Sequence, residues 1–497
     1  MAAALLAVVG PAGAADDARP GKAVRVTDTP VAARTFEGPA AAVDPTDDRR
    51  VFLAATDMAA EKCLIYRSVD RGATFGQLDG PDFRPFTDCG LNKAGISKNL
   101  RQRLVFDPEG VLYWVVAVAD PAAMGGRSIV LARSTDAGDT WTTTVVARAP
   151  IPADPVDAVA NFVPDLFVNR LGDAPRMVWV SWRRSYTPES RKGTEGWAAA
   201  STDGGRTFGP EVRGLTADPG FDAPRVVVDA DGAAYWFQRE RLPRPPQGEA
   251  PKPARLLMAR STDGGRTWTE GDVGQSSLVL EEPLAAVSKD GRTVYLAWED
   301  TSNGDLDLFF KSTTDGGRTW AQPVRVNDDP VGNKRTQKWP RMDVAPDGRI
   351  DLVWYDYRHE GVDTPDNDLE FYLGDINDAY YAWSDDGGKT FSPNVRATAE
   401  SVNRRFGTYN KQYFVEVPAA VGSADDGVFV AWSDTRLANA DTQAQDIFGA
   451  WIEVEDGGGG VSSRALLIAA EVALIVAGVV LLVLVARNRR KSVPSTG

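Results

Sequence analysis

The chain has 497 residues and a formal net charge of −14, from 69 acidic and 55 basic side chains, with one histidine and two cysteines. Nucleic-acid binding needs a concentrated basic face, and no cluster of Lys and Arg precedes the last residues, so we exclude nucleic acid as a partner. The single His359 and the lack of cysteine pairs at metal-ligand spacing argue against zinc chemistry.

The N-terminal residues resemble an export signal. The apolar run LLAVVG and the small-residue sequence AGA that ends at Ala14 match the core and the cleavage site of a signal peptide. We therefore expect residues 1–14 to be a signal peptide. No Lys or Arg precedes the apolar core, which leaves open a start further upstream.

The two cysteines, Cys63 and Cys89, lie in a domain that we expect to be exported. A disulfide between them would close a loop of about 26 residues and stabilise the fold by roughly 3.5 kcal/mol on the chain-entropy model. Two buried free thiols are the alternative.

An eight-residue pattern, SxDxGxT followed by an aromatic residue, occurs six times and organises the chain. In each copy the aspartate is suited to accept backbone N–H bonds across a tight turn, and the fifth-position glycine permits a positive φ. The closing Trp or Phe begins the next strand and supplies an apolar anchor. We therefore predict six β-hairpin turns, whose aspartates are Asp70, Asp136, Asp203, Asp263, Asp315 and Asp386.

These copies resemble the Asp box of the sialidase superfamily. The resemblance implies a β-propeller in which each box joins the third and fourth strands of a blade, on the face opposite the ligand site. The six boxes are accordingly expected to be structural.

A second repeat, an alternating apolar strand, a polar turn with glycine and a strand rich in Val, Tyr and Trp, occurs seven times. It predicts an all-β propeller of seven four-stranded blades over residues 23–454, with six blades as the alternative. The last copy has no Asp box after its third strand, Asp446–Val454, whereas Ala23–Pro30 matches the fourth-strand segment Pro323–Pro330. We expect the N-terminal segment to complete the last blade and so to hide the sheet edges.

Charged residues recur at the ends of the second strands, on the face opposite the boxes. They are Asp57, Asp120, Arg184, Glu240, Asp300, Asp356 and Asp434. Arginines recur seven residues before turn glycines, at Arg103, Arg225 and Arg341. Two interpretations are open for these arginines: cross-strand ion pairs with Asp120, Glu240 and Asp356 within blades, or a shared anion site.

The resemblance to sialidases also implies an arginine triad for the sugar carboxylate, a Tyr–Glu nucleophile and an Asp acid/base. The sialidase FRIP motif should precede the first Asp box, but the chain has FRPF at Phe83–Phe86, after it, so that motif does not transfer. Weak catalytic candidates are Tyr357, Tyr413, Glu281, Glu282 and Asp356. Aromatic packing between blades is the other interpretation of each tyrosine.

An acidic insertion, His359–Tyr381, lengthens a turn of the sixth blade. Its oxygen-rich side chains, with Asp363, Asp366 and Asp368 as weak candidates, suit calcium, although their spacing differs from an EF-hand. A solvated loop or a lid over the site is the alternative. Calcium apart, no cofactor is expected.

The C-terminal part predicts a membrane anchor. Residues 465–486 are long and apolar enough to cross a bilayer as a helix, with Glu471 as their one charge. The basic tail, 487–497, places the C-terminus in the cytoplasm, and the Gly-rich segment 455–463 reads as a tether. We therefore expect a single-pass cell-membrane protein with its ectodomain outside.

Two functions from different classes remain. The first is a sialidase-like propeller that binds a cell-surface or extracellular glycan or protein. The alternative is an exo-α-sialidase-type glycoside hydrolase that acts on terminal acidic sugars. Because propellers host many unrelated roles, the fold alone does not decide between them.

Overall fold

The structure is a computed structural model that describes residues 18–27, 36–57, 60, 62–86, 101–121, 127–150, 159–169, 177–186, 194–215, 223–240, 255–274, 282–359, 376–407, 418–439 and 441–454. The chain divides into two compact units, Arg19–Glu453 and Met1–Ala18 with Val454–Gly497. The first unit contains the sheets described below.

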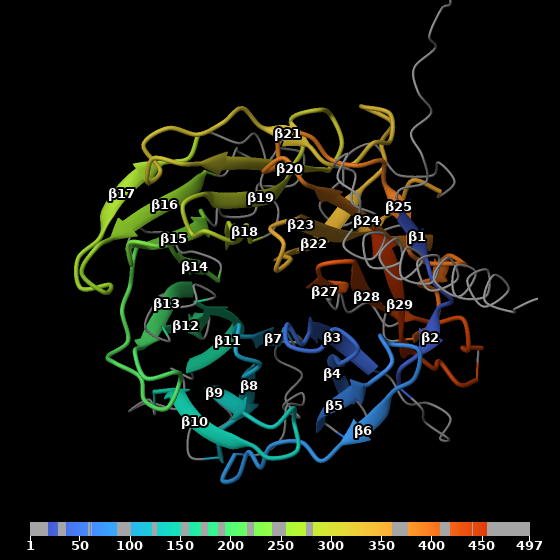
Figure 1. Cartoon of the computed structure of the whole chain (residues 1–497), viewed down its shortest axis with the longest axis horizontal. Coiled ribbons are helices and arrows are strands. Elements are labelled where there is room, and N and C mark those ends of the chain that lie inside the picture. Colours follow the sequence, from blue (N-terminus) through green and yellow to red (C-terminus); the bar gives the residue numbers. More distant parts are fainter. Residues whose placement is uncertain are drawn as a thin grey trace, which may run out of the picture. The chain divides into compact units, whose positions relative to one another are not determined.

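Seven antiparallel sheets, called blades 1 to 7 in the order of their inner strands, follow one another around a ring (Figure 1). The inner strands are β3 (Phe36–Val43), β7 (Arg103–Phe106), β11 (Val159–Val168), β14 (Arg225–Val228), β18 (Leu284–Val287), β22 (Gln337–Val344) and β27 (Ala420–Ala424). The second strands are β4 (Val51–Asp57), β8 (Leu112–Ala119), β12 (Val178–Tyr186), β15 (Ala234–Arg239), β19 (Val294–Asp300), β23 (Ile350–Asp356) and β28 (Gly427–Asp434).

The third strands are β5 (Lys62–Ser68), β9 (Arg127–Ser134), β13 (Thr194–Ser201), β16 (Leu256–Ser261), β20 (Asp307–Thr313), β24 (Ile376–Ser384) and β29 (Asp446–Val454). The outer strands are β6 (Gly76–Leu78), β10 (Thr142–Ala147), β17 (Thr269–Asp272), β21 (Val324–Arg325), β25 (Val395–Arg396) and β1 (Ala18–Pro20), while β26 (Val402–Asn403) and β2 (Val24–Arg25) also pair with β24 and β29. The predicted seven blades are confirmed, and the six-blade alternative is excluded.

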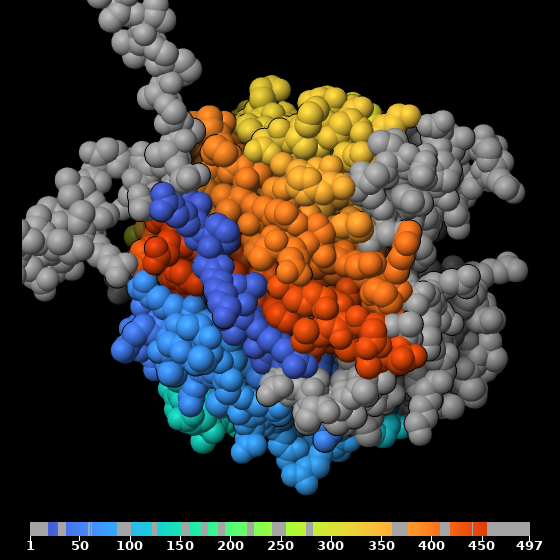
Figure 2. All heavy atoms as spheres, turned by 90° about the vertical axis from the view of Figure 1, so that its right-hand side faces the viewer, coloured from blue at the N-terminus to red at the C-terminus, as the bar shows by residue number. Residues whose placement is uncertain are grey.

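The N-terminal segment closes the ring, as the sequence predicts. Val24 pairs with Gly449 and Arg25 with Phe448 of β29. The Thr27 hydroxyl donates to the Asp446 carboxylate at 3.0 Å and accepts from the Ile447 N–H at 3.0 Å. Figure 2 shows the dark blue N-terminal strands against the red C-terminal ones at the side of the ring. Blade 7 therefore joins the two ends of the domain.

Large apolar side chains fill the space between blades. The fully buried tryptophans are Trp114, Trp179, Trp182, Trp236, Trp354 and Trp432. A buried aromatic side chain removes about 200 Å² from water, worth on the order of 5 kcal/mol at about 25 cal/mol per Å². The Asp-box aromatics pack beside these layers, as Trp268 does edge-on against Trp179 and Trp236.

All six Asp boxes have the same bonding. In the box of blade 3, Asp203 accepts from the Thr207 N–H at 2.9 Å and from the Thr207 hydroxyl at 2.6 Å, while Ser201 Oγ accepts from the Gly205 N–H at 2.8 Å. The fifth-position glycines have φ between 81° and 87°, as predicted. A Cβ at any of these glycines would also approach a neighbouring blade's side chain within 3 Å, at Gly388 to 1.9 Å from Phe310. The motif thus needs glycine for packing as well as for backbone conformation.

Blade 3 differs from the prediction, because it has three strands rather than four. After its Asp box, the described chain pairs with β13 through an isolated bridge between Ala198 and Val212, and the Gly209 N–H donates to the Ala200 carbonyl at 2.9 Å. Proline does not explain this difference, because blade 6 carries Pro393 at the equivalent position, two residues before Val395, and still forms β25.

Among the described residues, no helix is long and apolar enough to cross a membrane. The expected signal peptide (1–14), tether (455–463), membrane span (465–486) and tail (487–497) lie outside those residues.

Candidate functional site

The inner strands carry a repeated proline where they meet the central channel. In blades 1, 3 and 6 this proline follows a residue with positive φ, namely Gly38 (65°), Val163 (51°) and Trp339 (56°), and each strand is bulged there. A positive φ is unfavourable for valine and tryptophan. Bulges of this kind re-aim side chains next to functional sites, and here they come just before Asp165 and Arg341.

Three arginines occupy the position after this proline, or its equivalent, in alternate blades. They are Arg103 in blade 2, Arg225 in blade 4 and Arg341 in blade 6, with Gln102, Pro224 and Pro340 before them. Asp165 of blade 3 lies between the first two and pairs with Arg103 at 3.0 Å and with Arg225 at 3.5 Å. Side chains from separate blades therefore converge on the centre of the ring.

A second ion pair joins this group from opposite sides of the channel. Arg101, two residues before Arg103, pairs with Glu282 of blade 5, and both side chains are buried. The charges of Arg101 and Glu282 both act on Arg225. We call Arg101, Arg103, Arg225 and Arg341, with Asp165 and Glu282, the arginine cluster.

Arg341 is the unusual member of the arginine cluster. It is 7% exposed, and among the described residues its only hydrogen bond goes to the Pro340 carbonyl at 3.3 Å, with no carboxylate partner. Burial and the nearby charges of Arg103, Arg101 and Arg225 lower its pKa well below the usual guanidinium value. Burial also lowers the pKa of Arg225, opposed by Asp165 and Glu282.

The arginine cluster has four guanidinium groups and two carboxylates, so it carries excess positive charge among the described residues. A buried charge without a partner is costly unless another charge compensates it. Convergent guanidiniums offer fixed forks of donors that match a carboxylate. The geometry therefore suits an anion with planar oxygens.

The alternative interpretation of these arginines, ion pairs within blades, is not found among the described residues. Arg103 lies opposite Val115, five residues short of Asp120, and Arg225 and Arg341 lie three residues short of Glu240 and Asp356. At about 3.3 Å per residue, these offsets correspond to about 10–17 Å along the strands.

The carboxylates at the ends of the second strands have local partners instead. Three of them, Asp300, Asp356 and Asp434, accept from the indole of the tryptophan two residues earlier and from the N–H two residues later. Asp120 pairs with Arg148, and Glu240 with Arg255. Arg184 pairs with Glu211. These residues, predicted as a charged rim, shape the loops of their own blades.

The predicted catalytic residues are not brought together in one place among the described residues. Tyr357 is buried and accepts from Asn377 Nδ2 at 3.3 Å. Asp356 is bonded to Arg358, and burial raises its pKa, while Glu282 belongs to the arginine cluster. Tyr413 and Glu281 lie outside the described residues.

A Tyr–Glu pair that the sequence did not suggest lies in blade 3. The Tyr186 hydroxyl donates to Glu195 at 2.7 Å, and Arg213 pairs with the same carboxylate at 3.1 Å. Burial and this hydrogen bond raise the pKa of Tyr186 to about 12, which disfavours the nucleophilic phenolate. The neighbouring charges are those of Arg184 and Arg213 rather than those of the arginine cluster.

Two predicted features fall partly or wholly outside the described residues. Cys63 is disulfide-bonded, and Cys89 is the other cysteine of the sequence. The calcium candidates Asp363, Asp366 and Asp368 lie in the undescribed part of the insertion, 360–375, and the described residues contain no group of three or more potential metal-ligating side chains.

No family model and no curated protein matches this sequence. Solved structures do match. A protein of unknown function from Dyadobacter fermentans has 15% identity and a TM-score of 0.46, with 88% of this chain and 99% of that chain covered. An α-L-arabinanase of Penicillium chrysogenum, complexed with arabinobiose, has 15% identity and a TM-score of 0.42, with 67% and 94% covered.

A Hadza microbial sialidase has 16% identity and a TM-score of 0.42, with 82% of this chain and 74% of that chain covered. The number and closure of the blades rest on the strand pairing within this chain. The sialidase-like resemblance of the chain rests on its six Asp boxes.

Proposed function

We propose that this chain is a glycan-binding propeller whose arginine cluster binds the carboxylate of a terminal acidic sugar. The observation that carries the proposal is Arg341, a buried guanidinium with no carboxylate partner among the described residues. A bound carboxylate would supply the missing charge. The sialidase-like Asp boxes favour an acidic sugar as the source of that carboxylate.

The arrangement favours binding over hydrolysis. Three guanidiniums from alternate blades fix the carboxylate, and Asp165 keeps two of them, Arg103 and Arg225, in place. Of the described tyrosines, Tyr357 accepts from Asn377, while burial and the hydrogen bond to Glu195 raise the pKa of Tyr186 and disfavour its phenolate.

The direct test is calorimetric titration of the full chain with N-acetylneuraminic acid, the simplest terminal acidic sugar. Hydrogen bonds to charged groups contribute about 1.5–3 kcal/mol each, so Arg341→Met should weaken binding about tenfold to a hundredfold. Arg255→Met is the matched control, because Arg255 is an exposed arginine of blade 4 that pairs with Glu240. Equal affinities for the wild type and Arg341→Met would reject the proposal.

The enzymatic alternative is tested on the same preparations with a fluorogenic sialoside. Binding alone predicts no turnover. If the wild type hydrolyses the sialoside and Tyr357→Phe or Tyr413→Phe abolishes this activity, the protein is a glycoside hydrolase and the binding proposal is wrong. The proposal places the binding domain outside the cell on a C-terminal membrane anchor, which accessibility of the domain to protease on intact cells would test.

A further inference from the structure

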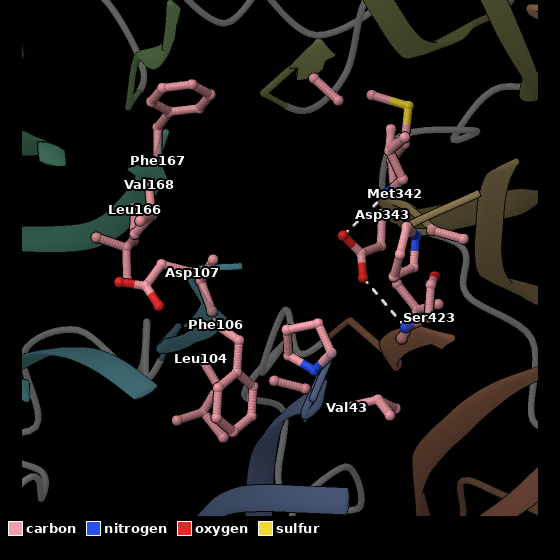
Figure 3. A pocket seen from close by; sticks show the side chains of 18 of the residues that line it. Val43, Leu104, Phe106, Asp107, Leu166, Phe167, Val168, Met342, Asp343 and Ser423 are labelled. Atoms are coloured by element: carbon pink, nitrogen blue, oxygen red, sulfur yellow. Dashed lines mark hydrogen bonds between the residues drawn. The ribbon is translucent and has the colours of Figure 1, made fainter. Parts of the chain in front are cut away.

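The central channel widens into a chamber on the Asp-box side of the arginine cluster. This cavity has a volume of about 310 Å³ and is lined by the inner strands of six blades, all except blade 4. Figure 3 shows Leu166 and Asp107 on one side of it and Met342, Asp343 and Ser423 on the other, around an open space. The volume lies at the lower end of the range for small-molecule sites.

The chamber walls are largely aliphatic and aromatic. Their apolar side chains include Val43, Leu104, Phe106, Leu166, Val168 and Met342. The two wall carboxylates are already engaged: Asp107 accepts from the Val111 N–H at 2.8 Å, and Asp343 accepts from the Val344 and Ser423 N–H groups at 2.9 and 3.1 Å. Cavities lined by apolar groups bind apolar molecules in preference to water.

The two ends of the chamber carry positive charge. Arg103 lies at the inner end, where its Nε side faces Asp165 and its terminal nitrogens make no hydrogen bond to a described residue. At the outer end, turns of the inner hairpins bring Lys289, Pro45 and Pro108 to the rim. An elongated ligand in this chamber would therefore meet, at its inner end, a guanidinium whose terminal nitrogens make no hydrogen bond to a described residue.

We propose that the chamber binds a small amphipathic monocarboxylate, with its apolar tail along the channel and its carboxylate at Arg103. This ligand enters from the Asp-box face, opposite the acidic sugar. The inference rests on the proposed function only in that both ligands use Arg103. Since one guanidinium serves both carboxylates, the two ligands should compete.

The test is a titration series of the full chain with acetate, butanoate, hexanoate and octanoate, with the heats of any solubilising agent subtracted. Burial of each added methylene should tighten binding about fourfold until the chamber is full. Affinity that does not change with tail length would overturn the inference.

A chamber-filling variant, Ala285→Phe, separates the two sites. Ala285 lines the chamber from β18. The matched control is Ala73→Phe, at an exposed Asp-box position where the other boxes carry Asp139, Arg206, Arg266, Arg318 and Lys389. Ala285→Phe should abolish the dependence on tail length and keep N-acetylneuraminic acid binding, whereas Ala73→Phe should keep both.

The outcomes for the two ligands are distinguishable. Sugar binding without tail-dependent octanoate binding rejects the chamber and keeps the proposed function. Tail-dependent octanoate binding without sugar binding rejects the proposed function and keeps the chamber. Because Ala285→Phe can also destabilise the fold, its melting temperature is measured, and the wild-type length series decides if that variant is unfolded.

Discussion

Two buried arginines allow one substitution to be tested in opposite environments. Arg341 has no carboxylate partner among the described residues, whereas Arg349, which is 3% exposed, has a carboxylate and several carbonyls as hydrogen-bond acceptors. Arg349 donates to both oxygens of Asp351, at 2.8 and 3.1 Å, and to the carbonyls of Asp425, Ala424 and Gly427 at 2.8–3.1 Å. It thereby joins blade 6 to blade 7.

Methionine keeps the length and apolar stem of each side chain and removes its charge. At Arg349 the change leaves the buried Asp351 without its cation, and breaking a buried pair in this way costs about 3–5 kcal/mol of stability. At Arg341 it removes a buried charge that has no carboxylate partner among the described residues, so the stability should stay the same or rise. We therefore expect Arg349→Met to lose stability and Arg341→Met to keep or gain it.

Chemical unfolding of the full chain, followed by tryptophan fluorescence, measures both variants. At a concentration one hundred times the wild-type Kd, N-acetylneuraminic acid should add about 2.7 kcal/mol to the stability of the wild type and only about 0.4–1.4 kcal/mol to that of Arg341→Met, whose affinity is about tenfold to a hundredfold lower. If Arg341→Met destabilises the free protein as much as Arg349→Met does, then Arg341 has a partner and the reasoning fails.

Three further predictions concern the fold. Deletion of residues 18–27 should lower the melting temperature and promote self-association seen by light scattering, because it exposes the edge of the last blade; an unchanged monomer of equal stability would argue against closure. Gly387→Ala should lower the free energy of unfolding by about 1–2 kcal/mol, because alanine is strained at the positive φ of this position. Gly388→Ala should cost about 1–3 kcal/mol more, because its Cβ would also clash with the Phe310 ring. Equal losses of stability in denaturant unfolding would contradict this. Hydrogen bonds from Thr319 lower the pKa of Asp315 to about 2, below its value in the unfolded chain. The charged carboxylate therefore stabilises the fold above about pH 4, and this contribution is lost as the pH falls toward 2. The difference in stability between Asp315→Asn and the wild type should shrink over this range, and a constant difference would refute the prediction.

Most of the fold follows from repeated patterns in the sequence. The Asp boxes fix where the third and fourth strands turn, and the match between Ala23–Pro30 and Pro323–Pro330 predicts which strand completes the last blade. Both are local patterns whose geometry does not depend on distant residues. The missing fourth strand of blade 3 was not predictable in this way, because the segment after its Asp box has the same proline spacing as the segment that forms β25 in blade 6.

The site was only partly predictable. The spacing to turn glycines found Arg103, Arg225 and Arg341, because equivalent positions in equivalent strands reach the same level of the channel. It missed Asp165, an acid at the position that carries an arginine in blades 2, 4 and 6, and Arg101, which lies two residues before Arg103. Partner choice depends on which blades face each other across the ring, and no pattern within a blade contains that information.

The central claim is that the arginine cluster recognises a carboxylate. Its most direct test compares the affinities of the full chain for N-acetylneuraminic acid and for the methyl ester of that sugar, which differ in the charge of one group. Loss of charge-assisted hydrogen bonds to the guanidiniums predicts that the ester binds about tenfold to a hundredfold more weakly. Equal affinity for the acid and the ester would contradict the account.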